Sequence, residues 1–208
     1  MKKKVVIIDY GLGNIRSAQN SIQKAIKLYN IEGSVERSSD HKSLIEATHI
    51  VLPGQGAFEA CMNGLKNLKG MIEELHNQVI INKKPILGIC VGMQLLADKG
   101  FENGNHKGLG WVSGNIIKIP NNTNVLPHMG WNQITCSTKH PILNEIYNEH
   151  YFFVHSYYFE VKNKKNIIAY SDYGIEFPAL IVKENIIGVQ FHPEKSSKAG
   201  IKLLSNFL

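Results

Sequence analysis

The most informative stretch of the sequence is Lys84-Pro85-Ile86-Leu87-Gly88-Ile89-Cys90-Val91-Gly92-Met93-Gln94-Leu95-Leu96-Ala97. The short apolar run that ends at Cys90 predicts a buried strand, and the apolar residues that follow it predict a helix. The spacing Gly-x-Cys-x-Gly is that of a nucleophile elbow, a sharp strand-to-helix turn that exposes its central side chain. A glycine two residues to either side leaves room for such a turn. A buried core cysteine at a strand end fits this stretch equally well.

Strands and helices alternate through the first half of the chain. This alternation predicts a three-layer α/β fold with a mostly parallel central sheet. Ligands of such sheets bind at the carboxyl ends of the strands, where Cys90 lies. The expected strands are Val5 to Asp9, Ser34 to Arg37, His49 to Leu52 and Ile86 to Ile89, and the expected helices are Ser17 to Leu28, His41 to Ala47 and Leu68 to Asn82.

After Ala97 the pattern changes to shorter strands separated by turns, which predicts an additional, smaller antiparallel sheet. A hairpin turn is expected at Lys183-Glu184-Asn185. The expected strands are Trp111 to Ile119, Asn132 to Cys136, Tyr151 to Val161, Ile167 to Ser171, Ala179 to Val182 and Ile186 to Phe191, before a terminal helix over Gly200 to Leu208.

Composition limits the classes of function. A length of 208 residues predicts one domain, residues 1–208. The net charge is +6, but the lysines are scattered without interleaved aromatic residues, so we expect no nucleic-acid partner. No apolar run approaches the roughly 20 residues that span a bilayer, so we expect no membrane association. Three widely spaced cysteines fit neither a disulfide framework nor a zinc site and indicate a cytoplasmic protein. Gly11-Leu12-Gly13 lacks the third glycine of a dinucleotide fingerprint, because Arg16 occupies that position. We therefore expect neither a cofactor nor a metal.

A cysteine nucleophile needs a base and a group that orients the base. Nine histidines are present, and three of them, His128, His155 and His192, lie at or beside expected strand ends. Only His192 has a carboxylate close by, at Glu194. Pro193 favours extended chain, in which residues two apart face the same side, so Glu194 could orient the imidazole as the acid of a triad does. A solvated turn is the alternative for these residues.

Pro53-Gly54-Gln55-Gly56 follows the third expected strand. Glycines after a strand free backbone N–H groups to bind an anion, so this loop could form an oxyanion hole beside Cys90. An ordinary turn has the same composition.

These motifs together resemble those of the class I, triad-type glutamine amidotransferases over residues 5–208. The resemblance rests on Gly88-Ile89-Cys90-Val91-Gly92-Met93-Gln94 and Gln190-Phe191-His192-Pro193-Glu194. It implies a flavodoxin-like fold and hydrolysis of L-glutamine by Cys90, His192 and Glu194. It also implies oxyanion or substrate-binding roles for Gly54, Gly56, Val91, Gln94, Glu102, Ser156 and Tyr157.

Further stretches are similar to those of the members that supply ammonia for imidazole glycerol phosphate synthesis. They are Asp9 to Asn14, Pro53 to Phe58, Pro127 to Asn132, Phe153 to Tyr158 and Glu194 to Ser196. This similarity implies a heterodimer with a (β/α)8-barrel cyclase of the HisF type, which receives the ammonia through a tunnel. There the ammonia yields imidazole glycerol phosphate and aminoimidazole carboxamide ribotide in histidine biosynthesis. The residues implied at the interface or its hinge are Asn14, Trp131 and Lys195.

The chain departs from the commoner family pattern at Gln55, Val91 and Trp111. An alternative is therefore a paralogous subunit that supplies ammonia for amidino-sugar synthesis on surface polysaccharides. A cysteine peptidase or deglycase on a similar fold is another alternative, against which His192-Pro193-Glu194 and Gln94 argue.

Overall fold

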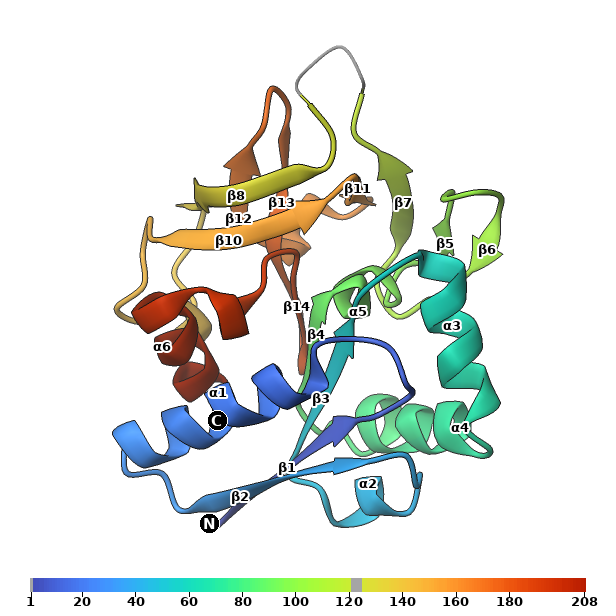
Figure 1. Cartoon of the computed structure of the whole chain (residues 1–208), viewed down its shortest axis with the longest axis vertical. Coiled ribbons are helices and arrows are strands. Elements are labelled where there is room, and N and C mark those ends of the chain that lie inside the picture. The colour runs from blue at the N-terminus through green and yellow to red at the C-terminus, as the bar shows by residue number, and fades with distance from the viewer. Residues whose placement is uncertain (1, 121–124) are drawn as a thin grey trace.

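The apolar runs of the first half form the parallel part of an eight-stranded sheet (Figure 1). A computed structural model describes residues 2–120 and 125–208. The sheet order is β2-β1-β3-β4-β14-β13-β12-β9; the pairs from β2 to β14 are parallel and the rest are antiparallel. These strands are β1 (Lys3–Ile8), β2 (Gly33–Ser38), β3 (His49–Gly54), β4 (Ile86–Cys90), β9 (Thr135–Cys136), β12 (Ile167–Asp172), β13 (Glu176–Lys183) and β14 (Ile186–Val189).

Helices cover both faces of the parallel strands, which explains why β3 and β4 are buried along their whole length. Figure 1 shows α1 (Ile15–Leu28) and α6 (Ser197–Phe207) on one side and α3 (Phe58–Asn67) and α4 (Met71–His76) on the other. The short helix α2 (Ser43–Glu46) precedes β3. The three-layer α/β prediction is therefore confirmed. None of the described helices is both long and apolar enough to cross a membrane.

The described residues also form two smaller sheets, whereas the sequence predicted one smaller antiparallel sheet. The first pairs β8 (His128–Gln133) with β10 (His150–His155), antiparallel. The second has the order β11-β7-β5-β6 and is mixed, because β5 runs parallel to β7. Its strands are β5 (Lys99–Gly100), β6 (His106–Lys107), β7 (Gly114–Lys118) and β11 (Tyr157–Val161).

Several expected elements differ from those in the structure. The strand expected over Tyr151 to Val161 breaks at Ser156, and its halves, β10 and β11, join different sheets. The helix expected over Leu68 to Asn82 begins only after Gly70, whose φ of +76° ends the preceding segment, and continues as a π-helix, η1 (Asn77–Ile81). Helix α3 was not expected at all. The hairpin turn is confirmed, with Glu184 at φ +55° between β13 and β14.

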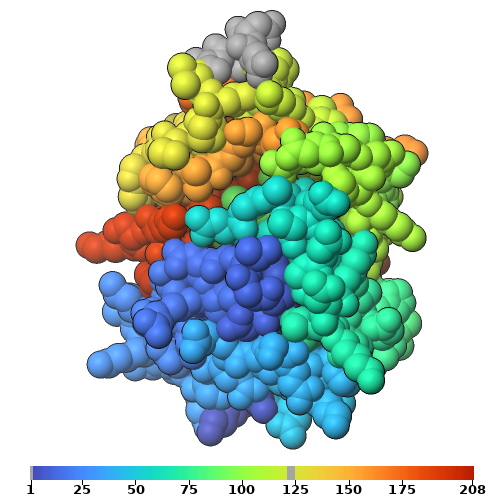
Figure 2. Space-filling model, turned by 45° about the vertical axis from the view of Figure 1, so that its right-hand side comes forward, coloured from blue at the N-terminus to red at the C-terminus, as the bar shows by residue number. Residues whose placement is uncertain are grey.

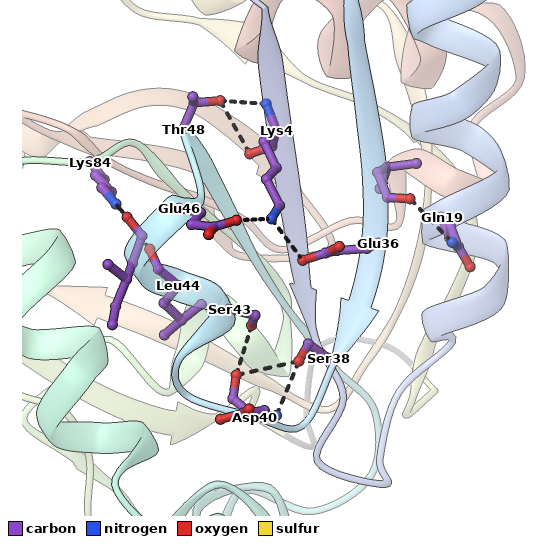
Figure 3. A network of polar contacts seen from close by, with 12 residues as sticks. Lys4, Gln19, Glu36, Ser38, Asp40, Ser43, Leu44, Glu46, Thr48 and Lys84 are labelled. Carbon is purple, nitrogen blue, oxygen red and sulfur yellow. Dashed lines mark hydrogen bonds and ion pairs between the residues drawn. The ribbon is translucent and has the colours of Figure 1, made fainter.

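A polar network ties together the amino-terminal ends of the strands (Figure 3). Lys4 Nζ lies 2.7 Å from Glu46 Oε2 and 3.6 Å from Glu36 Oε1. The backbone N–H of Lys4 donates to Thr48 Oγ1 at 2.8 Å, and that hydroxyl donates back to the Lys4 carbonyl at 3.1 Å. These contacts join β1, β2 and α2 near the amino-terminal ends of the parallel strands, whereas Cys90 lies at the carboxyl-terminal end of β4.

Candidate active site

Cys90 lies at a strained turn between β4 and the short helix α5 (Val91–Gln94). Its φ is +54° and its ψ is −113°, a conformation that a residue with a side chain adopts only when its surroundings enforce it. The two glycines of the motif permit the close packing that enforces it. A Cβ on Gly92 would lie 1.8 Å from the Leu52 carbonyl oxygen, and one on Gly88 would lie 2.7 Å from the Gly92 oxygen. The nucleophile-elbow prediction is confirmed in its geometry.

The thiol is nearly buried, with Cys90 3% exposed. Gln190 Nε2 donates to Cys90 Sγ at 3.8 Å, and Sγ lies 4.0 Å from the Val154 carbonyl oxygen. Val154 belongs to β10 and Gln190 follows β14, so two separate sheets surround the sulfur.

His192 and Glu194 form a buried pair beside the thiol. His192 Nδ1 donates to Glu194 Oε1 at 2.8 Å, and the two side chains are 2% and 3% exposed. Burial lowers the pKa of His192, but the interactions with Cys90 and Glu194 outweigh burial and raise it to about 10. The second ring nitrogen, Nε2, is buried and has no hydrogen-bond partner of good geometry among the described residues, Cys90 included. It is therefore available to exchange a proton with a bound reactant.

Residues 192–194 are not extended along their whole length, although the sequence predicted extended chain for the pairing of His192 with Glu194. His192 is extended, with φ −103° and ψ 94°, but Pro193–Lys195 forms a 3₁₀ turn, η4. This turn, rather than the strand period of two, brings the carboxylate under Nδ1. The expected reason for the pairing was wrong, although the residues do lie together.

A cavity of about 330 Å³ opens onto Cys90 and His192, within the usual range for small-molecule sites. Its walls come from both halves of the chain, which occupy the lower and upper parts of the molecule in Figure 2. The predicted residues that line it are Gly56, Val91, Gln94, Glu102, Ser156 and Tyr157. A larger cavity of about 530 Å³ lies between α3, α4 and Trp111, but no cysteine or serine lines it. Reactive groups, rather than volume, identify the smaller cavity as the candidate site.

Gln94 and Glu102 are held by other protein groups at the cavity wall. Gln94 Nε2 donates to the Tyr157 carbonyl and to Gln190 Oε1, each at 3.1 Å. Glu102 Oε2 accepts from the backbone N–H of Phe58 at 2.7 Å, at the first residue of α3. Both side chains are thus fixed in position before any ligand binds.

The two glycines of the candidate oxyanion loop have different positions. Gly54 does not line the cavity; it packs against the elbow, where a Cβ would lie 2.5 Å from the Gly92 nitrogen. Gly56 lines the cavity with a φ of +103°. The Tyr10 hydroxyl donates to the Pro53 carbonyl at 2.5 Å, and the Cys61 thiol donates to the Gln55 carbonyl at 3.5 Å. Two side chains thus hold the backbone of this loop from outside the cavity.

Sequence reasoning missed Gln190, which contacts both Cys90 and Gln94. A signal was present, because Gln190 lies two residues before His192 in chain expected to be extended. His128 and His155 were considered only as bases. The structure places them together, with His128 Nδ1 3.0 Å from His155 Nε2, and places His155 in the cavity wall.

Two of the three expected interface residues, Trp131 and Lys195, contact the ring of Phe152. Trp131 is 55% exposed and meets Phe152 edge-on, with ring centroids 6.3 Å apart. Lys195 Nζ lies 5.7 Å from the centroid of the same Phe152 ring. Asn14 precedes α1 and makes no side-chain cap there.

Comparisons with known proteins place this geometry in a family. Residues 6–208 match the family model described as glutamine amidotransferase class-I. The imidazole glycerol phosphate synthase subunit HisH of Pelagibacter ubique is 44% identical over 98% of each chain. The subunit of that name from Rhodospirillum rubrum is 42% identical over 99% of this chain and 98% of its own length.

Solved structures share the fold at lower sequence identity. The crystal structure of a glutamine amidotransferase superposes with a TM-score of 0.74 at 17% identity, over 98% of this chain and 96% of that one. A glutamine amidotransferase from Thermotoga maritima superposes with a TM-score of 0.64 at 19% identity, over 96% of this chain and 79% of that one. A strained cysteine elbow in such a fold, with full-length relatives above 40% identity, leads to one conclusion: the chain belongs to the class-I glutamine amidotransferase family, and within it to the HisH subunits of imidazole glycerol phosphate synthase.

Proposed function

We propose that this chain hydrolyses L-glutamine to glutamate and ammonia, and delivers the ammonia to a HisF-type cyclase subunit in histidine biosynthesis. The observation that supports this most is the buried His192–Glu194 pair, 2.8 Å apart, at the cavity that Cys90 enters from a strained turn. A thiol, a base and an oriented carboxylate are the groups that acyl transfer from an amide requires.

In the first half-reaction, Cys90 Sγ attacks the side-chain amide carbon of glutamine. Burial lowers the pKa of His192, but its interactions with Cys90 and Glu194 raise it to about 10, so Nε2 already holds the thiol proton when the attack begins. Glu194 stabilises the resulting imidazolium through Nδ1. The negative charge that develops on the amide oxygen is stabilised by backbone N–H groups, for which we propose those of Gly56 and Val91.

Collapse of the tetrahedral intermediate breaks the carbon–nitrogen bond. His192 donates its proton to the leaving nitrogen, which departs as ammonia and leaves a γ-glutamyl thioester on Cys90. Water then attacks the thioester carbon while His192 Nε2 accepts the water proton. The thiolate then leaves, glutamate is released as its γ-carboxylic acid, and the proton taken from water stays on His192 Nε2, which restores the starting pair. Atoms and protons balance without a cofactor.

The rest of the cavity wall fits the polar end of glutamine. We propose that Gln94 and Glu102 contact its α-amino and carboxylate groups, and that the Ser156–Tyr157 backbone holds the carboxylate. The hydrogen bonds that already fix Gln94 and Glu102 favour binding, because less side-chain freedom is lost. Gly54 packs behind the elbow, and we propose that it supports the oxyanion loop from there.

The partner follows from the relatives' name, which is that of a synthase subunit. We propose a heterodimer with a (β/α)8-barrel cyclase, an ammonia tunnel between the two sites, and Asn14, Trp131 and Lys195 at the interface or its hinge. We further propose that residues 1–208 act as one domain in the cytoplasm, where three free thiols remain reduced, and that neither nucleic acid nor membrane takes part.

Two assays test this function together. Ammonia release from glutamine should be slow for the chain alone and at least about tenfold faster when the cyclase subunit and its nucleotide are present. Expression of the chain should restore growth of a histidine auxotroph that lacks its own glutaminase subunit. Ammonia release without complementation would contradict the histidine-pathway assignment and favour a different ammonia acceptor.

A further inference from the structure

Two buried histidines connect strand β8 with the wall of the glutamine cavity. His128 lies on β8 and is 3% exposed; His155 lies on β10 and is 6% exposed. His155 Nδ1 lies 2.9 Å from the Tyr157 carbonyl oxygen, and His155 Nε2 lies 3.0 Å from His128 Nδ1. Asn132 Nδ2 approaches His128 Nε2 at 3.3 Å. The chain of contacts therefore begins at Asn132 and ends at a residue that lines the cavity.

The groups at the two ends of this series of contacts, the Asn132 amide and the Tyr157 carbonyl, fix the direction of every hydrogen bond in it. The Tyr157 carbonyl can only accept, so His155 Nδ1 carries a proton and His155 Nε2 is the acceptor. His128 Nδ1 must then donate to His155, and His128 Nε2 must accept from the Asn132 amide. Gln133 N–H donates to Asn132 Oδ1 at 2.8 Å, which fixes the orientation of that amide. Burial lowers the pKa of His155 to about 3 and that of His128 to about 4, so each ring carries one proton at neutral pH.

The Tyr157 carbonyl is a junction in the cavity wall. It accepts from His155 and also from Gln94 Nε2, at 3.1 Å, which uses both lone pairs. Ser156 and Tyr157 both line the cavity, and the Ser156 carbonyl accepts from the Ile119 N–H at 2.9 Å. The position of this peptide therefore depends on His155, and that of His155 depends on His128.

We infer that His128 and His155 are positioning residues for glutamine binding: as a hydrogen-bonded pair they hold the Tyr157 carbonyl, and with it the Ser156–Tyr157 peptide, at the cavity wall. This inference rests on the proposed glutaminase function. His128 does not line the cavity, so it acts only through His155. The opposite face of β8 carries Met129 and Trp131, which are 64% and 55% exposed.

Two substitutions at His128 separate its hydrogen bond from its packing. The ring stacks on Tyr173, with centroids 4.1 Å apart, and on Phe153, 4.9 Å apart. His128→Phe keeps an aromatic ring in this stack and removes the hydrogen bond to His155. His128→Asn loses the stack but places an amide donor near the position of Nδ1. His150→Asn is the matched control, because His150 is exposed at the start of the same ribbon and does not line the cavity.

The experiment measures KM and kcat for glutamine in the complex with the cyclase subunit and its nucleotide. We expect His128→Phe to raise KM about tenfold, the effect of leaving a buried acceptor unpaired, with kcat within about threefold. His128→Asn should stay within about threefold of the wild-type KM, and His150→Asn should match the wild type.

The opposite order, a wild-type KM for His128→Phe and a raised KM for His128→Asn, would mean that His128 acts by packing alone and would overturn the inference. If either His128 variant does not fold, Asn132→Ala decides, since it removes the donor to His128 Nε2 at a half-buried position: a KM rise of about two- to threefold supports the relay and an unchanged KM refutes it. A wild-type complex that releases no ammonia would instead refute the proposed function itself.

Discussion

Cys90 and Glu194 together set the charge that His192 can carry, against the effect of burial. The carboxylate is 2.8 Å from Nδ1 in a buried pair, so the protonated imidazole is stabilised although burial opposes it. The same interaction keeps His192 protonated until it donates its proton to the departing ammonia.

The pair also makes folding stability depend on pH. His192 has a folded-state pKa of about 10, above its ordinary value of 6.5. The folded chain therefore binds the His192 proton more tightly than the unfolded chain does. Its contribution to stability is complete below pH 6.5 and is lost as the pH rises towards 10.

We predict that the free energy of unfolding of the wild type, minus that of His192→Asn, falls between pH 6 and pH 10. Urea unfolding of both proteins at each pH measures this difference, and the titrations of groups that do not contact His192 cancel. A difference that stays constant or grows across this range would contradict the charged pair.

Among single residues, those defined by local spacing could be predicted from the sequence. Cys90 stands out because the elbow needs a glycine on each side, and Glu194 stands out because it lies two residues from His192. Long-range contacts carry no such signal. Gly54 was expected beside the substrate, but it packs on Gly92 because β3 and β4 pair in register at Gly54 and Cys90.

At the scale of elements, the elbow depends on close packing of α5 against β3. A methyl group on Gly92 would overlap the Leu52 carbonyl oxygen, 1.8 Å away, and that oxygen belongs to backbone in the middle of the sheet. The backbone has to move before a side chain fits there.

We predict that Gly92→Ala lowers the free energy of unfolding by about 3 kcal/mol. Gly56→Ala is the comparison, because its added Cβ meets no heavy atom within 4 Å, and its left-handed φ should cost about 1 kcal/mol. Denaturant unfolding measures both. Equal losses would mean that the overlap at Gly92 costs no more than the backbone strain at Gly56, and would contradict close packing as the constraint on the elbow.

Elements with continuous apolar runs could be predicted, and elements defined by tertiary contacts could not. Helix α3 has buried residues at Phe58, Cys61, Met62 and Leu65, a helical spacing that was available in the sequence and was missed. The break at Ser156 is different. Both flanking segments read as one strand, and only their pairing with β8 and β7 separates them.

At the scale of the whole molecule, the site is an assembly of two halves. The parallel strands supply Cys90 and the glycine loop, whereas the β8–β10 ribbon and the segment after β14 supply the opposite wall and His192. Alternation of strands and helices predicted the first half. The partners of the second half's short strands could not be predicted, because apolar alternation does not specify which strands pair.

The exposed Trp131, beside Phe152 and Lys195, marks the surface that we expect to bind the cyclase. Large exposed aromatic residues are frequent hot spots of interfaces. We predict that Trp131→Ala raises the Kd for the cyclase subunit about thirtyfold. Tyr147→Ala, at another exposed aromatic residue, should leave the Kd unchanged. Calorimetric titration measures both, and equal Kd values for wild type and Trp131→Ala would place the interface elsewhere.

Ammonia release by the Cys90→Ser complex tests directly whether the Cys90 thiol attacks glutamine. The variant should fold and bind the cyclase subunit as the wild type does, since a hydroxyl replaces a thiol of similar shape at the same elbow. With saturating glutamine and nucleotide, we predict that ammonia release falls by at least about a thousandfold. Ammonia release at the wild-type rate from the Cys90→Ser complex would contradict this prediction.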